Sequence, residues 1–357
     1  MPSDVYRRLA DRLDAIPNGF PRTDSGVELR LLAKIFTPEE AALAANLHLT
    51  FETADEIAVR VGQEPRAVYR TLKTMVRKGQ IRFNRKDGKL AFGLMPFVVG
   101  IYEEQLPRLD KELAMLFEQY FLEVQGGLVQ NGPPIHRVIP VREAVPASID
   151  IYPYEKATQL VGHASAWGVR DCICRLQQKL IGKGCDRPLE VCLALAPVSG
   201  AFDHSETTRA ISKEEAFRIL DDAAEAGLVH SPGNFQDGHY YICNCCTCCC
   251  GVLRNIAEFS VPTAIASSGF VAVVDASVCA GCGDCLERCQ FGALSVPESV
   301  CVVDAMRCVG CGLCVSVCPL QALKLERPAT REVSPPPETF AEWIVQRAEA
   351  RGMGTDW

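Results

Sequence analysis

The chain has 357 residues, of which 48% are hydrophobic and 23% are charged. These values are typical of a globular protein with two or three domains, and they exclude a disordered or collagen-like chain. The formal net charge is −7, so the molecule as a whole should not be drawn to polyanions unless its positive charge is concentrated in one region.

Cysteine is the exceptional residue: the chain has 19, and all of them lie between Cys172 and Cys318. The N-terminus lacks the apolar segment of a secretory signal, and the longest apolar runs are shorter than the ~20 residues that a membrane helix needs. We therefore expect a cytoplasmic protein without a membrane span. In a reducing compartment, clustered thiols indicate metal ligands or catalytic groups rather than disulfides.

Residues 1–126 contain no cysteine and predict a separate module with flanking helices. Capping boxes predict helices that begin after Thr37 and after Thr53, and an apolar stripe predicts a third helix over residues 65–78. Alternating residues around an Asp-Gly turn predict a hairpin over residues 81–94. Three helices followed by a hairpin, in this order, resemble a winged helix-turn-helix domain.

Positive charge is concentrated in this module, because the segment from Glu64 to Leu90 has nine basic and two acidic residues. Such a patch favours contact with the phosphates of nucleic acid or with an acidic protein. DNA binding and docking of a partner protein both stay open as interpretations. Four of the basic residues share one face of the third helix: Arg66, Arg70, Lys73 and Arg77.

Residues 127–269 predict a Cys-rich α/β domain that binds metal. A capping box at Ser212 predicts a helix that ends at Gly227. Thiols packed this densely would repel one another as thiolates and oxidise readily unless a metal held them. We expect one or two iron–sulfur clusters here. The ten cysteines form two groups, Cys172, Cys174, Cys185 and Cys192, and then Cys243, Cys245, Cys246, Cys248, Cys249 and Cys250.

Several arrangements of these ten thiols stay open. Zinc bound by the four cysteines of the first group is the alternative to a cluster. If residues 241–250 run extended, Cys243, Cys245 and Cys249 share one side, and Cys246, Cys248 and Cys250 the other. The pairing of Asp-Cys-Ile-Cys-Arg at 171–175 with Ile-Cys-Asn-Cys-Cys at 242–246 resembles a signature of ferredoxin-bearing proteins of anaerobic bacteria and archaea.

Residues 270–327 contain a repeat at a spacing of 29 residues. Each copy has a short β-branched strand, the pattern C-x2-C-x2-C-x3-C and a returning strand. The pattern resembles the bacterial dicluster ferredoxin, a small pseudo-twofold fold with two 4Fe–4S clusters. The resemblance implies that Cys279, Cys282, Cys285 and Cys318 hold one cluster, and that Cys308, Cys311, Cys314 and Cys289 hold the second.

Other residues of the repeat bear on the same site. Cys301 is expected to be a buried strand residue and not a ligand, and Gln290 follows Cys289 where the family has proline. A pair of zinc sites is the alternative use of this spacing. Four glycines are expected to let backbone N–H groups approach the cluster sulfides: Gly281, Gly283, Gly310 and Gly312.

We therefore expect an α+β multidomain protein, with a Pro-rich linker and a tail helix over residues 328–357. Clusters fully ligated by cysteine have no open iron for substrate, so their work is one-electron transfer. The expected function is relay of low-potential electrons to or from a partner oxidoreductase in an anaerobe, as a component and not a stand-alone enzyme. Two alternatives stay open: a redox-sensing regulator that binds DNA, and an enzyme that uses an unusual cluster in the middle domain.

Overall fold

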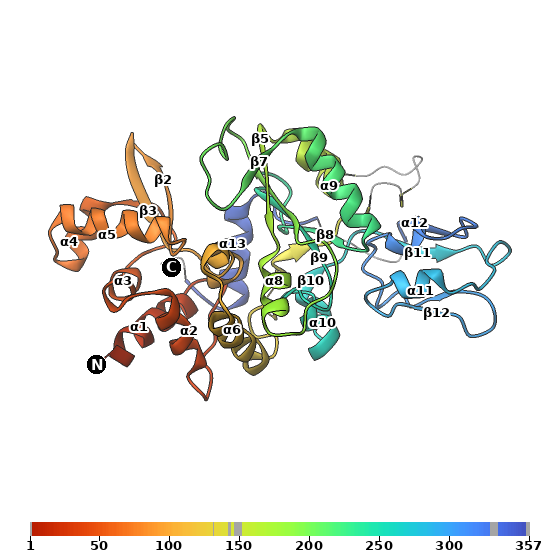
Figure 1. Cartoon of the computed structure of the whole chain (residues 1–357), viewed down its shortest axis with the longest axis horizontal. Coiled ribbons are helices and arrows are strands. Elements are labelled where there is room, and N and C mark those ends of the chain that lie inside the picture. The colour runs from red at the N-terminus through yellow and green to blue at the C-terminus, as the bar shows by residue number, and fades with distance from the viewer. Residues whose placement is uncertain (1, 131, 142–143, 146–151, 329–334, 355–357) are drawn as a thin grey trace. The chain divides into compact units, whose positions relative to one another are not determined.

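A computed structural model of the chain describes residues 2–130, 132–141, 144–145, 152–328 and 335–354 (Figure 1). The chain forms two compact units: unit 1 comprises residues 1–131 and 344–357, and unit 2 comprises residues 132–343. No helix in the described ranges is long and apolar enough to cross a membrane.

Unit 1 combines helices with a small antiparallel sheet in the order β1-β3-β2. The expected capping boxes at Thr37 and Thr53 are formed, and both helices begin at the next residue. The expected third helix and hairpin are also present. The elements are α1 (Pro2–Asp14), α2 (Val27–Ile35), α3 (Pro38–Ala44), β1 (Glu52–Thr53), α4 (Ala54–Val61), α5 (Pro65–Arg77), β2 (Arg82–Lys86), β3 (Lys89–Gly93), the irregular turn η1 (Phe97–Ile101), the short helix η2 (Glu103–Arg108), and α6 (Lys111–Val124).

Helix α5 is strongly amphipathic, since Val68, Leu72 and Met75 are buried while its basic side chains face solvent. The basic side chains of the hairpin are less available than those of α5, because Lys86 and Lys89 form ion pairs with acidic side chains of α4 at 2.8 and 3.8 Å. Part of the positive charge in this region is thus offset within the unit, and the exposed cationic surface is mainly that of α5.

The middle part of unit 2 is built on a five-stranded antiparallel sheet with the order β7-β5-β6-β9-β8. Side chains of α7 and α9 pack with Val169, Leu193 and Ile242 of the sheet to form one apolar core. Ser212 caps α9 as expected. The elements are β4 (His136–Arg137), η3 (Pro153–Glu155), α7 (Ala157–His163), β5 (Ala166–Asp171), α8 (Ile173–Leu180), β6 (Glu190–Ala196), β7 (Arg209–Ile211), α9 (Lys213–Glu225), β8 (Val229–Pro232), β9 (Tyr241–Cys245), α10 (Arg254–Phe259), η4 (Pro262–Ala264) and β10 (Ile265–Ala266).

The repeat folds into two similar halves, each with a short helix after its cysteine loop. The outer strands of the repeat pair with one another, and so do the inner strands. The tail helix follows, and its residues from Ile344 onward belong to unit 1. The elements are β11 (Val271–Val274), α11 (Asp284–Arg288), β12 (Leu294–Ser295), β13 (Val302–Val303), α12 (Leu313–Ser316), β14 (Leu323–Glu326) and α13 (Phe340–Ala350).

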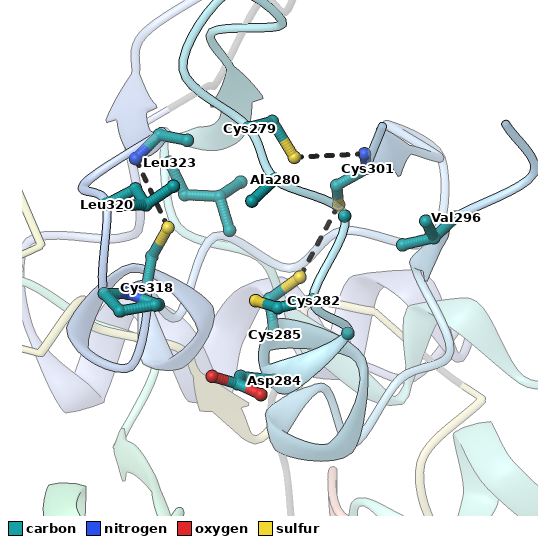
Figure 2. Close-up of a pocket in the computed structure, with 14 residues that line it drawn as sticks. Cys279, Ala280, Cys282, Asp284, Cys285, Val296, Cys301, Cys318, Leu320 and Leu323 are labelled. Atoms are coloured by element: carbon teal, nitrogen blue, oxygen red, sulfur yellow. Dashed lines mark hydrogen bonds between the residues drawn. The ribbon is translucent and has the colours of Figure 1, made fainter. Parts of the chain in front are cut away.

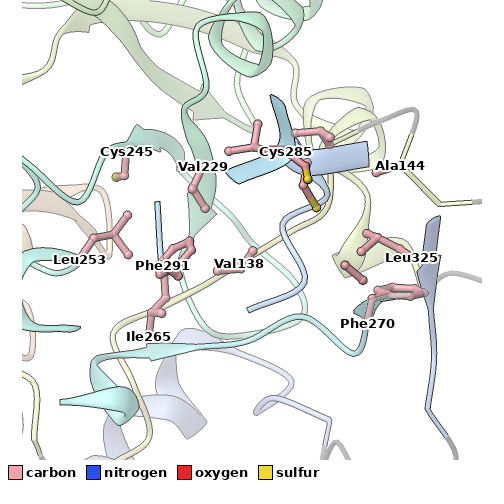
Figure 3. Packing of buried hydrophobic residues seen from close by; sticks show 14 of the residues in the cluster. Val138, Ala144, Val229, Cys245, Leu253, Ile265, Phe270, Cys285, Phe291 and Leu325 are labelled. Carbon is pink, nitrogen blue, oxygen red and sulfur yellow. The ribbon is translucent and has the colours of Figure 1, made fainter. Parts of the chain in front are cut away.

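A second apolar core joins the repeat to the Cys-rich part of unit 2 (Figure 3). Phe291 of the repeat lies with Val229, Cys245 and Leu253 of the middle part in this core, which continues to Cys285. The repeat that begins near residue 270 therefore shares its hydrophobic core with the Cys-rich region before it. Removing these side chains from water supplies the main favourable term that holds both parts together.

Candidate metal centres

The first set of repeat cysteines surrounds one pocket (Figure 2). Cys279, Cys282 and Cys285 reach it from the first loop, and Cys318 reaches it from the end of the second half. Cys318 is brought close because the paired outer strands fold the second half back onto the first. The set that the ferredoxin resemblance implied from both halves of the chain therefore meets in space.

Backbone N–H groups point at the sulfur atoms of this region. The N–H of Cys301 donates to Cys279 Sγ at 3.4 Å, and that of Ala322 donates to Cys318 Sγ at 3.2 Å. In the other half, the N–H of Ala293 donates to Cys289 Sγ at 3.4 Å. Such bonds stabilise thiolate ligands and tune a bound cluster. Thiols around a common pocket, with N–H donors aimed at their sulfurs, fit an iron–sulfur cluster.

The second set of repeat cysteines is also close together. The pKa of Cys311 is raised to about 12, chiefly by burial and also by the charges of Cys308 and Cys289. Burial raises the pKa of Cys314 as well, followed by the charges of Cys311, Cys308 and Cys289. Thiolates held this close repel one another until a cation is bound between them, so this set also fits a cluster.

The backbone conformation around the cysteine loops explains why glycine occupies four of their positions. A Cβ at Gly281 would lie 2.3 Å from the Ser299 carbonyl oxygen, and one at Gly310 would lie 2.2 Å from that of Phe270. Both have positive φ, as do Gly283 and Gly312, which precede α11 and α12. Close chain approach and left-handed backbone account for these glycines, and contact of their N–H groups with cluster sulfides stays a prediction.

Cys301 is buried, as expected, and lies directly before β13. It also lines the first pocket, with its Sγ 3.6 Å from Cys285 Sγ (Figure 2). Burial raises the pKa of Cys301 to about 12, so this thiol stays protonated. The position of this thiol at the pocket was not expected, because the equivalent residue in the first half is Ala272, which carries no sulfur; that Cys301 is not a ligand stays a prediction.

The ten thiols of the middle region form two groups that differ from those predicted for an extended segment over residues 241–250. Strand β9 ends at Cys245, and the next residues form a turn in which the Cys250 N–H donates to the Cys246 carbonyl at 3.0 Å. The turn breaks the alternation of sides, so Cys250 joins Cys243 and Cys245. Cys249 instead joins Cys246 and Cys248.

The first resulting group, the four-thiol group, comprises Cys185, Cys246, Cys248 and Cys249, whose sulfur atoms all lie within 4.8 Å of one another. Cys185 Sγ is 3.7 Å from Cys249 Sγ and 3.9 Å from Cys246 Sγ. The alternative prediction of a zinc ion bound by Cys172, Cys174, Cys185 and Cys192 had the wrong ligand set. In the structure, Cys185 lies with the cysteines of the turn after β9.

The second group, the six-thiol group, is a network of hydrogen-bonded thiols, of which Cys245 and Cys250 are buried and the other four are partly buried. Hydrogen bonding to Cys174, and then burial, raise the pKa of Cys172. Hydrogen bonding to Cys243 is the largest cause that raises the pKa of Cys245. The contacts run in the order Cys172, Cys174, Cys250, Cys245, Cys243 and Cys192.

The sheet order explains why these six thiols meet. Cys172 follows β5, Cys192 lies in β6 and Cys243 lies in β9, and these three strands are neighbours. The Arg175 guanidinium lies beside them, where burial lowers its pKa but the charges of Cys172 and Cys246 raise it more, so it stays charged. Clustered, partly buried thiols with a fixed cation beside them can stabilise a bound metal centre.

Gln290, the departure from the ferredoxin pattern, links the repeat to the cysteine turn. Its Oε1 accepts from the Thr247 N–H at 2.7 Å, and its Nε2 donates to the carbonyls of Gly227 and Cys245. The residue that follows one cluster cysteine thus holds the turn that separates the two thiol groups. A proline at this position has no side-chain amide and cannot make this link.

We expect Gln290→Ala to destabilise unit 2 by about 1–2 kcal/mol, because the partly buried Thr247 N–H and two carbonyls lose their partner. Denaturant unfolding without oxygen measures the change. Glu287→Ala, an exposed position on α11, is the control and should change the stability little. Equal stability of both variants would contradict the structural role of this side chain.

Comparison with known protein families identifies a 4Fe–4S dicluster domain at residues 278–322. No curated protein and no solved structure matches the chain. The matched segment contains all eight cysteines of the repeat pattern. Iron–sulfur binding is thereby shown for this segment of a larger protein.

Proposed function

We propose, from the premise that residues 278–322 form a 4Fe–4S dicluster domain, that this protein relays low-potential electrons to or from a partner oxidoreductase. The observation that carries the proposal is the crossed set of Cys279, Cys282, Cys285 and Cys318 around one pocket. The bound clusters would supply one-electron transfer, since full cysteine ligation opens no iron to substrate. Cys289, Cys308, Cys311 and Cys314 would hold the second cluster.

The charge around the domain supports a low potential. The segment from Val271 to Glu326 has six acidic and three basic residues. Net negative charge disfavours the addition of an electron to a cluster. All three basic residues are engaged within the protein: Arg288 donates to the Glu225 carbonyl, Arg307 donates to the Phe291 carbonyl, and Lys324 pairs with Glu326.

The surface beside the first pocket supports docking of a redox partner. Cys282 is exposed, so the bound cluster would lie near solvent on this side. Val278, which precedes Cys279, is 43% exposed, and Leu320 at the pocket is 49% exposed. Apolar side chains around an exposed redox centre favour a short-lived protein contact that shortens the distance for the electron.

We also propose a further iron–sulfur cluster in the six-thiol group. Its support is the convergence of six buried or partly buried thiols from three neighbouring strands and their flanking segments, which is more than the four thiolates of one cubane. The core shared with Phe291 and the Gln290 link make this group continuous with the repeat. Electrons could therefore pass within one packed body.

Iron and acid-labile sulfide counting on protein purified without oxygen tests the proposal. We expect about twelve irons per chain, with eight assigned to the dicluster domain, and a brown protein that a low-potential reductant bleaches. About eight irons would overturn the further cluster alone. A colourless protein without labile sulfide would overturn the function.

The exposed face of α5 favours a second candidate, a redox-sensing regulator that binds DNA through a winged helix-turn-helix in unit 1. Within the described ranges, no acidic side chain forms an ion pair with Arg66, Arg70 or Lys73. Gel-shift titration of promoter DNA with oxidised and reduced protein tests it. Redox-dependent binding that weakens steeply with salt, and weakens further in Arg70→Ala, would favour the regulator. Binding equal to that of random DNA would exclude it.

A further inference from the structure

We infer that the four-thiol group, Cys185, Cys246, Cys248 and Cys249, binds a single divalent zinc ion and not an iron–sulfur cluster. This site is separate from the dicluster domain and from the six-thiol group. The inference does not depend on the proposed electron transfer, since a zinc ion has no redox chemistry here.

The spacing of the sulfur atoms carries this inference. Four thiolates in a tetrahedron around one zinc ion, with bonds of ~2.3 Å, are separated by about 3.8 Å along each edge. The observed separations are 3.9 Å for Cys185 and Cys246, 3.7 Å for Cys185 and Cys249, and 3.8 Å for Cys248 and Cys249. The group is therefore already spaced for one ion.

A cluster requires a wider arrangement. Each thiolate of a 4Fe–4S cluster binds a different iron at a corner of a cage, so the sulfurs must lie much farther apart than around one ion. The repeat provides the comparison within the same chain. The ligand atoms of the four-thiol group all lie within 4.8 Å of one another. Among the residues that the structure describes, no group of three or more repeat cysteines has sulfur atoms this close together.

The charge around the group agrees with a divalent ion. Four thiolates and one Zn²⁺ carry a formal charge of −2. Two guanidinium groups donate to these sulfurs, Arg187 to Cys248 and Arg175 to Cys246, each at 3.6 Å. The backbone N–H of Arg187 also donates a hydrogen bond to the Cys185 sulfur. These partners offset the negative charge and orient the ligands, as outer-sphere contacts do in metal sites.

The position of the ion in the chain gives it a structural role. Cys185 lies in the loop after α8, and the other three ligands lie in the turn after β9. The ion would clamp this loop to the turn, while Gln290 holds the turn from the other side through Thr247. Because Cys245 and Cys250 flank the same turn, the clamp would also fix two members of the six-thiol group.

Elemental analysis of the full chain, purified without oxygen from medium with both metals, tests the inference. We expect about one zinc per chain, and we expect Cys185→Ser to lose it while iron is unchanged. Cys192→Ser, in the six-thiol group, is the matched control and should keep the zinc. Loss of several irons with labile sulfide from Cys185→Ser would overturn the single-ion site. Loss of one iron in place of zinc would overturn the choice of metal.

Cobalt provides a second measurement that does not require a variant to lose its metal. Co²⁺ added to zinc-depleted protein should give the intense visible bands of a tetrahedral tetrathiolate site. Cys248→Ser, at the exposed corner of the site, should lower the sulfur-to-cobalt charge-transfer band by about a quarter, as one of four thiolates is replaced. An unchanged band in Cys248→Ser, or absent bands in the parent protein, would overturn the ligand set.

Discussion

Cys308→Ala is expected to remove one cluster from the dicluster domain and to slow electron transfer to the partner by ~10-fold or more. Cys308 lies among Cys289, Cys311 and Cys314, and the charge of its thiolate raises the pKa of two of these neighbours. With alanine in its place, one iron of the cluster loses its protein ligand. Iron and labile sulfide should each fall by about four per chain.

Cys301→Ala is the matched control for this variant. Cys301 is a buried cysteine of the same domain, and its sulfur lies 3.6 Å from that of Cys285. Because we assign it no ligand role, its loss should leave the iron content unchanged and cost only about 1–2 kcal/mol of stability. Iron loss in Cys301→Ala, or full iron and full transfer in Cys308→Ala, would contradict the ligand assignment. Electron paramagnetic resonance of the reduced proteins shows which cluster remains.

Cys245→Ser is expected to have the second large effect, which is loss of the cluster in the six-thiol group. Cys245 is central to the group, since its thiol hydrogen bonds to those of Cys243 and Cys250. It also lies in the core shared with Phe291. A serine hydroxyl is a poor ligand for iron, so we expect about four irons per chain to be lost while the signals of the dicluster domain persist.

Cys248→Ser is the control for this second variant, because Cys248 lies only three residues away but belongs to the four-thiol group. Its iron content should equal that of the parent protein. The pair of variants therefore separates the two thiol groups: Cys245→Ser changes the iron content, and Cys248→Ser changes only one ligand of the proposed zinc ion. Equal iron in the parent protein and in Cys245→Ser would refute the cluster in the six-thiol group.

Local sequence patterns are sufficient to predict the dicluster domain and the start of several helices. The spacing C-x2-C-x2-C-x3-C is short, and a loop of this length can only present its first three thiols to one side. Thr37, Thr53 and Ser212 set helix starts for a similar reason, because a capping side chain acts on the backbone within three residues of itself. Contacts between residues that are close in the sequence can therefore be predicted from the sequence.

The division of the ten middle cysteines was decided by the tertiary structure. Cys185 and Cys246 are 61 residues apart, and nothing in their spacing distinguishes Cys185 from Cys174 or Cys192 as a partner. The order of the strands gathers Cys172, Cys192 and Cys243, and the end of β9 at Cys245 turns the next thiols toward Cys185. The contacts of Gln290 arise in the same way, from a core that joins two distant segments. Such contacts depend on how the sheet and the core bring remote segments together, which alternation and spacing along one strand do not encode.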